Sequence, residues 1–297
     1  MKIRLFFVLA FLFVNQLLFA QTYAFKVLVS KGKTEVKNDN NWQTIKVGAS
    51  LKPTDEVKVG ENAYLGLIHA SGKPLEVREA KTFKVSDLVA KVNPGTSVIN
   101  KYTDFILSSE QQKKNRLSAT GAVHRGPVVP KDVILAFLPE SDLSKAYGDQ
   151  VTIAWSTNNV KGPYQVIFSN LMEEDIARID ATESFVTISL NDDKFKREPQ
   201  VMVRIVAKDK PGAGSKNYIV KRLQKDDRTK IDSLMAQLDP SMDRSSALTQ
   251  YVLAGFYEEN LLLVDALTAY HEAYRKAPDV ELYKNAYAEF LKRMEFK

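Results

Sequence analysis

The spacing of apolar residues changes near residue 225 of this 297-residue chain, and this change limits the folds that it can adopt. Before that point, most apolar residues fall in short runs separated by glycine, proline and other turn residues, as in β-strands. After it, they recur every three or four residues, as on one face of an α-helix. The sequence therefore predicts a multidomain, mainly β protein, with two small antiparallel β domains followed by an all-α C-terminal tail.

The first 20 residues follow the pattern of an export signal. A basic start precedes an apolar run from Leu5 to Val14, and a small residue, Ala20, ends the segment. The run is shorter than the roughly 20 apolar residues of a membrane-spanning helix. We therefore expect residues 1–20 to be a signal peptide, the protein to be exported and periplasmic or envelope-associated, and no integral membrane segment to remain. Cleavage after Ala24 and retention of the segment as an anchor are the alternatives.

Composition excludes several kinds of chemistry. The chain contains no cysteine, which rules out disulfides, thiolate nucleophiles and cysteine-ligated metal sites. Its formal net charge of +6 arises from basic residues spread among nearly as many acidic ones. Such a surface does not predict a nucleic-acid partner.

Residues 25–88 contain short strands and glycine turns in a recurring order: a tryptophan strand, a Gly-x-x-Leu segment, an aspartate followed by an aliphatic residue, and two further glycine turns. The residues that form this order are Trp42, Gly48, Leu51, Asp55, Val57, Gly60, Leu65, Leu67 and Gly72. The segment resembles the FecR-like domain of bacterial envelope proteins. That resemblance implies a periplasmic β domain, which in the family's regulators is joined through a membrane helix to a cytoplasmic tail that controls a sigma factor. We expect no such tail here.

The same residues have structural roles that do not depend on the family. Glycine at 48, 60 and 72 falls where the chain must reverse its direction. Asp55 is placed to accept backbone N–H bonds within its own turn. Trp42 is expected to bring a large side chain into a small core.

The middle of the chain divides into three parts. Apolar residues at helical spacing predict a helical extension over 89–110, and a polar stretch with glycine and proline predicts a linker over 111–131. At least six alternating runs, beginning at 133–138, then predict a β-sandwich over 132–224. This segment resembles an immunoglobulin or fibronectin type III module in architecture, with Trp155 as the core tryptophan. Its acidic residues 173–175 are expected in a loop.

Residues 226–297 form the predicted helical tail. Within it, residues 247–279 place a leucine, small residues, aromatic residues and a proline at a characteristic spacing. These residues are Leu253, Ala254, Tyr257, Ala266, Tyr270, Ala273 and Pro278. The pattern resembles one tetratricopeptide repeat. Because one repeat cannot bury a continuous core, we expect the tail to lean on its flanking helices, on the sandwich or on a partner.

No pattern of catalytic or ligand-binding residues emerges. The three histidines, His69, His124 and His271, fall in different predicted segments and lack the spacing of a zinc site. Phosphate-binding loops and nucleophile elbows are missing from the sequence. We therefore predict no catalytic, cofactor-binding or metal-binding residue, no cofactor, and a protein that is not an enzyme.

The leading hypothesis is a non-catalytic envelope interaction or scaffold protein that binds a protein partner through the tail, residues 226–297, using side chains between Ser245 and Glu272. The alternative is a module that binds a cell-wall polymer or polysaccharide through exposed aromatic residues such as Tyr64 or Tyr164. A transmembrane signalling regulator of the FecR type is the third reading, and it rests on the N-terminal resemblance alone.

Overall fold

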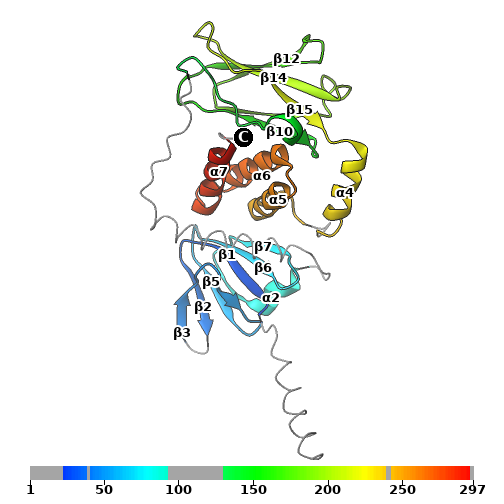
Figure 1. Ribbon diagram of the computed structural model, residues 1–297. Coiled ribbons are helices and arrows are strands. Elements are labelled where there is room, and N and C mark those ends of the chain that lie inside the picture. The colour runs from blue at the N-terminus through cyan, green and yellow to red at the C-terminus, as the bar shows by residue number, and fades with distance from the viewer. Residues whose placement is uncertain (1–22, 39–40, 93–129, 239–241, 295–297) are drawn as a thin grey trace, which may run out of the picture. The chain divides into compact units, whose positions relative to one another are not determined.

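The computed structural model describes residues 23–38, 41–92, 130–238 and 242–294 (Figure 1). The chain forms two compact units, Met1–Pro94 and Gly95–Lys297, and each is described by itself. The predicted signal peptide, most of the helical extension and nearly all of the linker lie outside the described residues.

The first unit contains two four-stranded antiparallel sheets and one short helix. One sheet has the order β4-β1-β6-β7, and the other has the order β3-β2-β5-β8. The strands are β1 Phe25–Lys31, β2 Thr34–Asn38, β3 Asn41–Thr44, β4 Ser50–Leu51, β5 Glu56–Val59, β6 Tyr64–His69, β7 Pro74–Val77 and β8 Thr82–Lys84, and the helix is α2 Val85–Ala90.

Apolar residues from both sheets form one core in the first unit. Val27, Val57 and Leu65 are fully buried within it. Gly48 and Gly72 have positive φ angles of +86° and +90°, a conformation that residues with a side chain rarely adopt. The Asp55 carboxylate accepts the Lys52 N–H at 2.7 Å and closes its own turn.

Trp42 does not lie in this core, although the sequence led us to expect it there. Its side chain is 40% exposed. The reason is strand register: Trp42 pairs with Lys37, and the residue before Lys37, Val36, faces the core. Because neighbouring residues of a strand point to opposite faces, Lys37 and Trp42 both face outward.

The β-sandwich of the second unit consists of a five-stranded sheet, β12-β11-β14-β15-β9, and a two-stranded sheet, β10-β13. All neighbouring strands are antiparallel except β15 and β9, which pair in parallel. The strands are β9 Lys145–Ala146, β10 Gln150–Ala154, β11 Tyr164–Ser169, β12 Asp175–Ala181, β13 Phe185–Ser189, β14 Gln200–Ala207 and β15 Tyr218–Arg222, and a 3-10 turn, η2, spans Ser141–Ser144.

Two strands differ from the sequence-based expectation. The run at 133–138 forms isolated bridges, such as Ala136 with Trp155, instead of a regular strand. Conversely, β12 begins at Asp175 and was not predicted. Its core residues are the alanines Ala177 and Ala181, and Ile176 and Ile179 are only partly buried against the core, so its apolar signal is weak.

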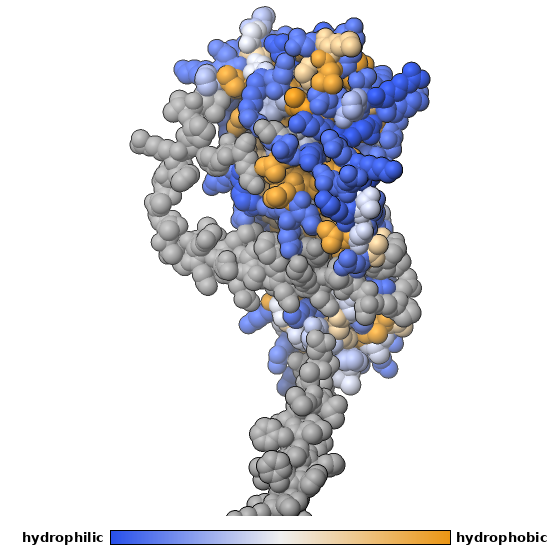
Figure 2. Space-filling view, turned by 45° about the vertical axis from the view of Figure 1, so that its right-hand side comes forward, coloured by the Kyte–Doolittle hydropathy of each residue, from blue (hydrophilic) through white to orange (hydrophobic). Residues whose placement is uncertain are grey.

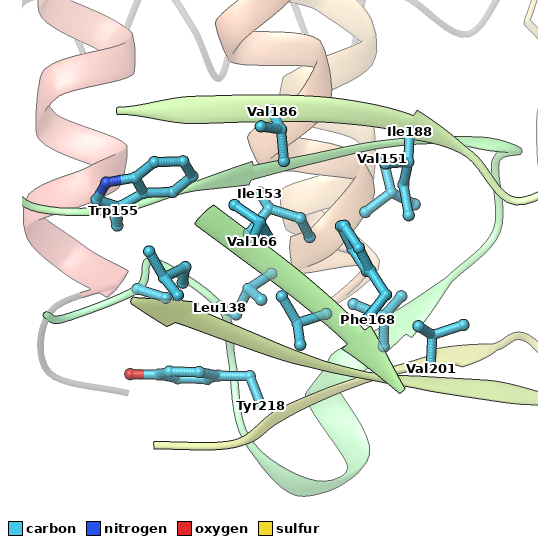
Figure 3. Packing of buried hydrophobic residues seen from close by; sticks show 14 of the residues in the cluster. Leu138, Val151, Ile153, Trp155, Val166, Phe168, Val186, Ile188, Val201 and Tyr218 are labelled. Carbon is cyan, nitrogen blue, oxygen red and sulfur yellow. The ribbon is translucent and has the colours of Figure 1, made fainter. Parts of the chain in front are cut away.

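The core of the sandwich lies between its two sheets. Figure 3 shows side chains of the two-stranded sheet, including Val151 and Ile153, pointing toward Val166 and Phe168 of the larger sheet. Trp155 is buried at one end of this core, as expected, with its ring 5.2 Å from that of Tyr164. Because apolar residues recur at every second position in β10, β11 and β14, each strand presents one continuous apolar face to the core.

Four helices follow the sandwich: α4 Lys225–Met235, α5 Ala247–Glu259, α6 Leu263–Lys276 and α7 Glu281–Met294. Helices α5 and α6 form a tightly packed hairpin, and α6 also packs on β10. Figure 1 shows the second unit as layers, with β12 and β14 on one side, β10 between, and α5 to α7 on the other. The expected order, antiparallel β sheets followed by C-terminal helices, is confirmed.

Within the described ranges, no helix has both the length and the apolar character that crossing a membrane requires.

Candidate interaction surfaces

A buried carboxylate on α6 accepts hydrogen bonds from the sandwich and so connects the C-terminal helices to it. Asp265, near the start of α6, accepts the Tyr147 N–H at 2.8 Å and the Gly148 N–H at 2.6 Å. Both donors lie between β9 and β10, more than a hundred residues earlier in the chain. The two carboxylate oxygens thus satisfy two partly buried backbone donors that would otherwise have no protein acceptor.

A second set of contacts surrounds Tyr147. Its hydroxyl donates to Asp232 of α4 at 2.8 Å, and its carbonyl accepts from the Arg228 guanidinium at 2.6 Å. That guanidinium also lies over the Tyr147 ring, 4.9 Å from its centroid. The Tyr147 ring lies 6.4 Å from that of Tyr257 in α5. One loop of the sandwich therefore contacts α4, α5 and α6.

Helix α6 also covers strand β10. The Thr268 hydroxyl accepts the Thr152 N–H at 2.9 Å, on the edge of β10 that does not pair with β13. Val264 is fully buried and belongs to the sandwich core. An open strand edge is a site of unwanted association, and here a helix closes it. Of the three supports expected for the tail, the sandwich and the flanking helices are the ones observed in contact with it.

Burial raises the pKa of the Asp265 carboxyl to about 6, against the opposing effects of the Tyr147 and Gly148 N–H groups and of Arg228. An acid whose pKa is higher in the folded state binds more protons there, so the unfolding free energy falls as pH rises between about 4 and 6 and is constant above. We expect the second unit to be more stable at pH 5 than at pH 7.5 by about 1.4 kcal/mol from this group, since pH 5 lies about one unit below the folded-state pKa. Urea unfolding at several pH values checks this, and Asp265→Asn should remove the dependence; an unchanged dependence in that variant would contradict the assignment.

The tetratricopeptide-like residues lie mostly inside the helical layer. Leu253, Ala254, Ala266 and Ala273 are buried where α5 and α6 pack, and Tyr257 and Tyr270 are also buried. Pro278 is exposed, just beyond the end of α6. Between 245 and 272, the residues classed as exposed are Ser245, Glu259 and Leu261. This stretch therefore presents few side chains that a partner could contact.

The β11–β12 hairpin offers a different surface. At its tip, Leu171 is 57% exposed and Met172 is 82% exposed. Asn170 holds the turn, because its side-chain oxygen accepts the N–H groups of Met172 at 2.9 Å and Glu174 at 3.0 Å. The Asn170 N–H also donates to the Glu174 carbonyl at 3.0 Å. Two large apolar side chains are thus presented to solvent on a turn fixed by its own hydrogen bonds.

A pocket of about 200 Å³ lies beside this hairpin, on the outer face of the five-stranded sheet. Ile167 and Met202 supply apolar lining, and charges of both signs line the rest, from Arg178 and Arg204 and from Glu173 and Asp175. Arg178 is held by Asp175 and by the Gln165 side-chain oxygen at 3.0 Å. Arg204 pairs across the sheet with Ile167, and its guanidinium makes no hydrogen bond or ion pair with any residue that the structure describes. We call Leu171, Met172 and this pocket the hairpin surface.

Figure 2 shows one face of the molecule, on which hydrophobic side chains form small patches among hydrophilic ones. Isolated apolar residues are common on protein surfaces and need no explanation. The hairpin surface differs because its apolar pair is large, adjacent and carried on a turn whose backbone is held by hydrogen bonds.

The remaining expected residues are dispersed. Tyr64 and Tyr164 are both buried, so neither offers the exposed aromatic face that the polysaccharide alternative invoked. His69 contacts Ser71, whereas His271 is buried beside Phe185, and burial lowers its pKa. His124 lies outside the described residues. Over the described ranges, no cluster of three or more histidine, aspartate or glutamate side chains could hold a metal ion.

Neither a protein-family model nor a curated protein matches this chain. The functional argument therefore depends on the geometry of its own surfaces.

Sequence reasoning missed the hairpin surface. The sequence predicts a solvated acidic loop at residues 173–175, whereas Asp175 begins β12. The available signal was the adjacent apolar pair Leu171 and Met172, placed between Asn170 and acidic residues.

Proposed function

We propose that this protein is a non-catalytic interaction protein that binds a protein partner through the hairpin surface. The observation that carries the proposal is the pair Leu171 and Met172, exposed on a turn held by Asn170. A turn whose backbone is already ordered loses little backbone conformational entropy on binding, which favours its use at an interface. Methionine in particular adapts to the shape of an apolar pocket.

The chemistry of the neighbouring pocket favours a particular kind of partner. Arg204 lacks a carboxylate partner among the described residues and lies beside the apolar side chain of Ile167. An arginine of this kind pairs readily with a carboxylate. The proposed partner is therefore a protein that presents an apolar side chain next to an aspartate or glutamate.

The setting of this function is also a proposal. The signal-like N-terminus and the FecR-like pattern over 25–88 support an exported protein of the bacterial envelope. The sandwich is immunoglobulin- or fibronectin-like in this reading, and α5 with α6 corresponds to a tetratricopeptide-like pair. In our account this pair stabilises the sandwich, because its residues face inward, and it does not have the partner-binding role that the sequence predicts for the tail.

Paired variants test the proposal. The double variant Leu171→Asp, Met172→Asp places charge on the hairpin tip, while Leu261→Asp changes a leucine of similar exposure, 58%, in the turn between α5 and α6. We expect cross-linked capture from native envelope, quantified by mass spectrometry, to show a defined set of proteins at least about tenfold reduced with the double variant. Leu261→Asp should capture them as the wild type does.

Two results would contradict the proposal. If Leu261→Asp lost the captured proteins and the double variant kept them, the partner would bind the helical tail instead. Equal capture by all three proteins would exclude both surfaces. Lys194→Ser, at an exposed position of the loop before β14, serves as a neutral control.

A further inference from the structure

The outer face of the sheet β3-β2-β5-β8 in the first unit carries an exposed tryptophan among lysines. Strand register places two rows of outward side chains across this sheet. The first row is Trp42, Lys37, Glu56 and Lys84, and the second is Thr44, Glu35, Lys58 and Thr82. We call these residues the Trp42 face. The alternate residues Val36, Val57 and Phe83 are buried, which fixes the orientation of both rows.

Two lysines approach the exposed indole. Lys37 Nζ lies 6.0 Å from the centroid of the Trp42 ring, and Lys58 Nζ lies 5.9 Å from it. Both distances are within the range of a cation–π contact. The ring is therefore a flat apolar platform with positive charge near it.

The acidic residues of the Trp42 face are already engaged. Glu56 pairs with Lys37 at 3.8 Å, and Glu35 pairs with Lys33 at 3.8 Å. Lys58 and Lys84 make no ion pair with any residue that the structure describes. These two cations are therefore available to an anion that lies across the strands.

We propose that the Trp42 face binds an acidic polysaccharide. The C–H face of a pyranose ring can stack on the indole, while carboxylates on that sugar or the next reach Lys58 and Lys84. A flat sheet surface suits an extended polymer. A single aromatic platform favours a saccharide over a single-stranded nucleic acid, because proteins that bind the latter stack successive bases on several aromatic side chains. This site is independent of the hairpin surface.

Calorimetric titration of the full chain with a hexamer of galacturonate tests the proposal, with a neutral galactose hexamer as the matched control. We expect the galacturonate hexamer to bind, and the neutral hexamer to bind at least tenfold more weakly. A higher salt concentration should weaken the binding of the galacturonate hexamer. Trp42→Ala should weaken uronate binding about tenfold or more. Lys58→Gln should weaken it about threefold, as for an exposed ion pair, and Lys52→Gln, outside the face, should leave it unchanged.

Because Trp42 and Lys58 are outward-facing, these variants should unfold as the wild type does, and thermal unfolding checks this. The chain has two tryptophans, and Trp155 is buried, so a change in tryptophan emission on binding should vanish in Trp42→Phe. Three results would each overturn the proposal: no uronate binding at millimolar concentration, uronate binding unaffected by Trp42→Ala, or tighter binding of an oligothymidylate of equal charge than of the uronate.

Discussion

Asp265→Ala should destabilise the second unit by about 2 to 4 kcal/mol at pH 7.5. The carboxylate is the acceptor for the Tyr147 and Gly148 N–H groups, at 2.8 and 2.6 Å, and alanine leaves both partly buried donors without a protein acceptor. The difference in stability between the wild type and Asp265→Ala should increase on acidification. The raised pKa of Asp265 means that protonation stabilises the folded wild type, and the alanine variant cannot gain this stability. Asp265→Asn should cost less, since its amide oxygen can still accept one of the two bonds.

Urea unfolding followed by circular dichroism measures this effect. Asp209→Ala is the matched control, because Asp209 is exposed and its carboxylate makes no hydrogen bond or ion pair within the described residues. It should change stability by less than about 0.5 kcal/mol. If Asp265→Ala were as stable as this control, the carboxylate would not fasten the helices to the sandwich.

Removing residues 225–297 should prevent the sandwich from folding cooperatively, because the deletion should lower its unfolding free energy by more than about 5 kcal/mol. The truncation uncovers Thr152 and its strand edge, and it removes Val264 from the core. A chain that ends at Ala277 lacks α7 but retains α6 on β10, so its unfolding free energy should decrease by a smaller amount. The two truncations therefore separate the contribution of α4 to α6 from that of α7.

Trp155 reports the result directly. In a Trp42→Phe background it is the sole tryptophan of the chain, and its buried ring should emit at short wavelength while the sandwich is folded. Emission should shift to longer wavelength in the 225–297 deletion and not in the chain ending at Ala277. A deletion that kept short-wavelength emission and a wild-type unfolding transition would establish the sandwich as an independent domain and contradict this account.

Strands with regular alternation were predictable from the sequence, because burial on one face imposes a period of two. In β11, for example, Tyr164, Val166 and Phe168 are buried and the residues between them are not. Strand β12 escaped prediction for the converse reason. Its charged residues Asp175, Arg178 and Asp180 dominate the segment, as is common in an edge strand.

Features that depend on distant pairing could not be read from the sequence. Asp265 is an ordinary acidic residue of a helix start until its donors, 117 and 118 residues earlier, are known. The outward orientation of Trp42 depends on its register with Lys37, which residue type alone does not specify. Local sequence patterns predict helices and strands, whereas the candidate surfaces depend on which strands pair, in which register, and on how the helices pack against them.

The most direct test of the hairpin surface is site-specific photo-cross-linking. A photoreactive phenylalanine analogue is placed at position 172 in one protein and at position 261 in another, since both native side chains are largely exposed. Each protein is irradiated in native envelope, and adducts are identified by mass spectrometry. The account predicts one dominant protein adduct from position 172 that Arg204→Glu weakens, and none from position 261. An adduct from position 261 alone would contradict it and assign partner binding to the helices.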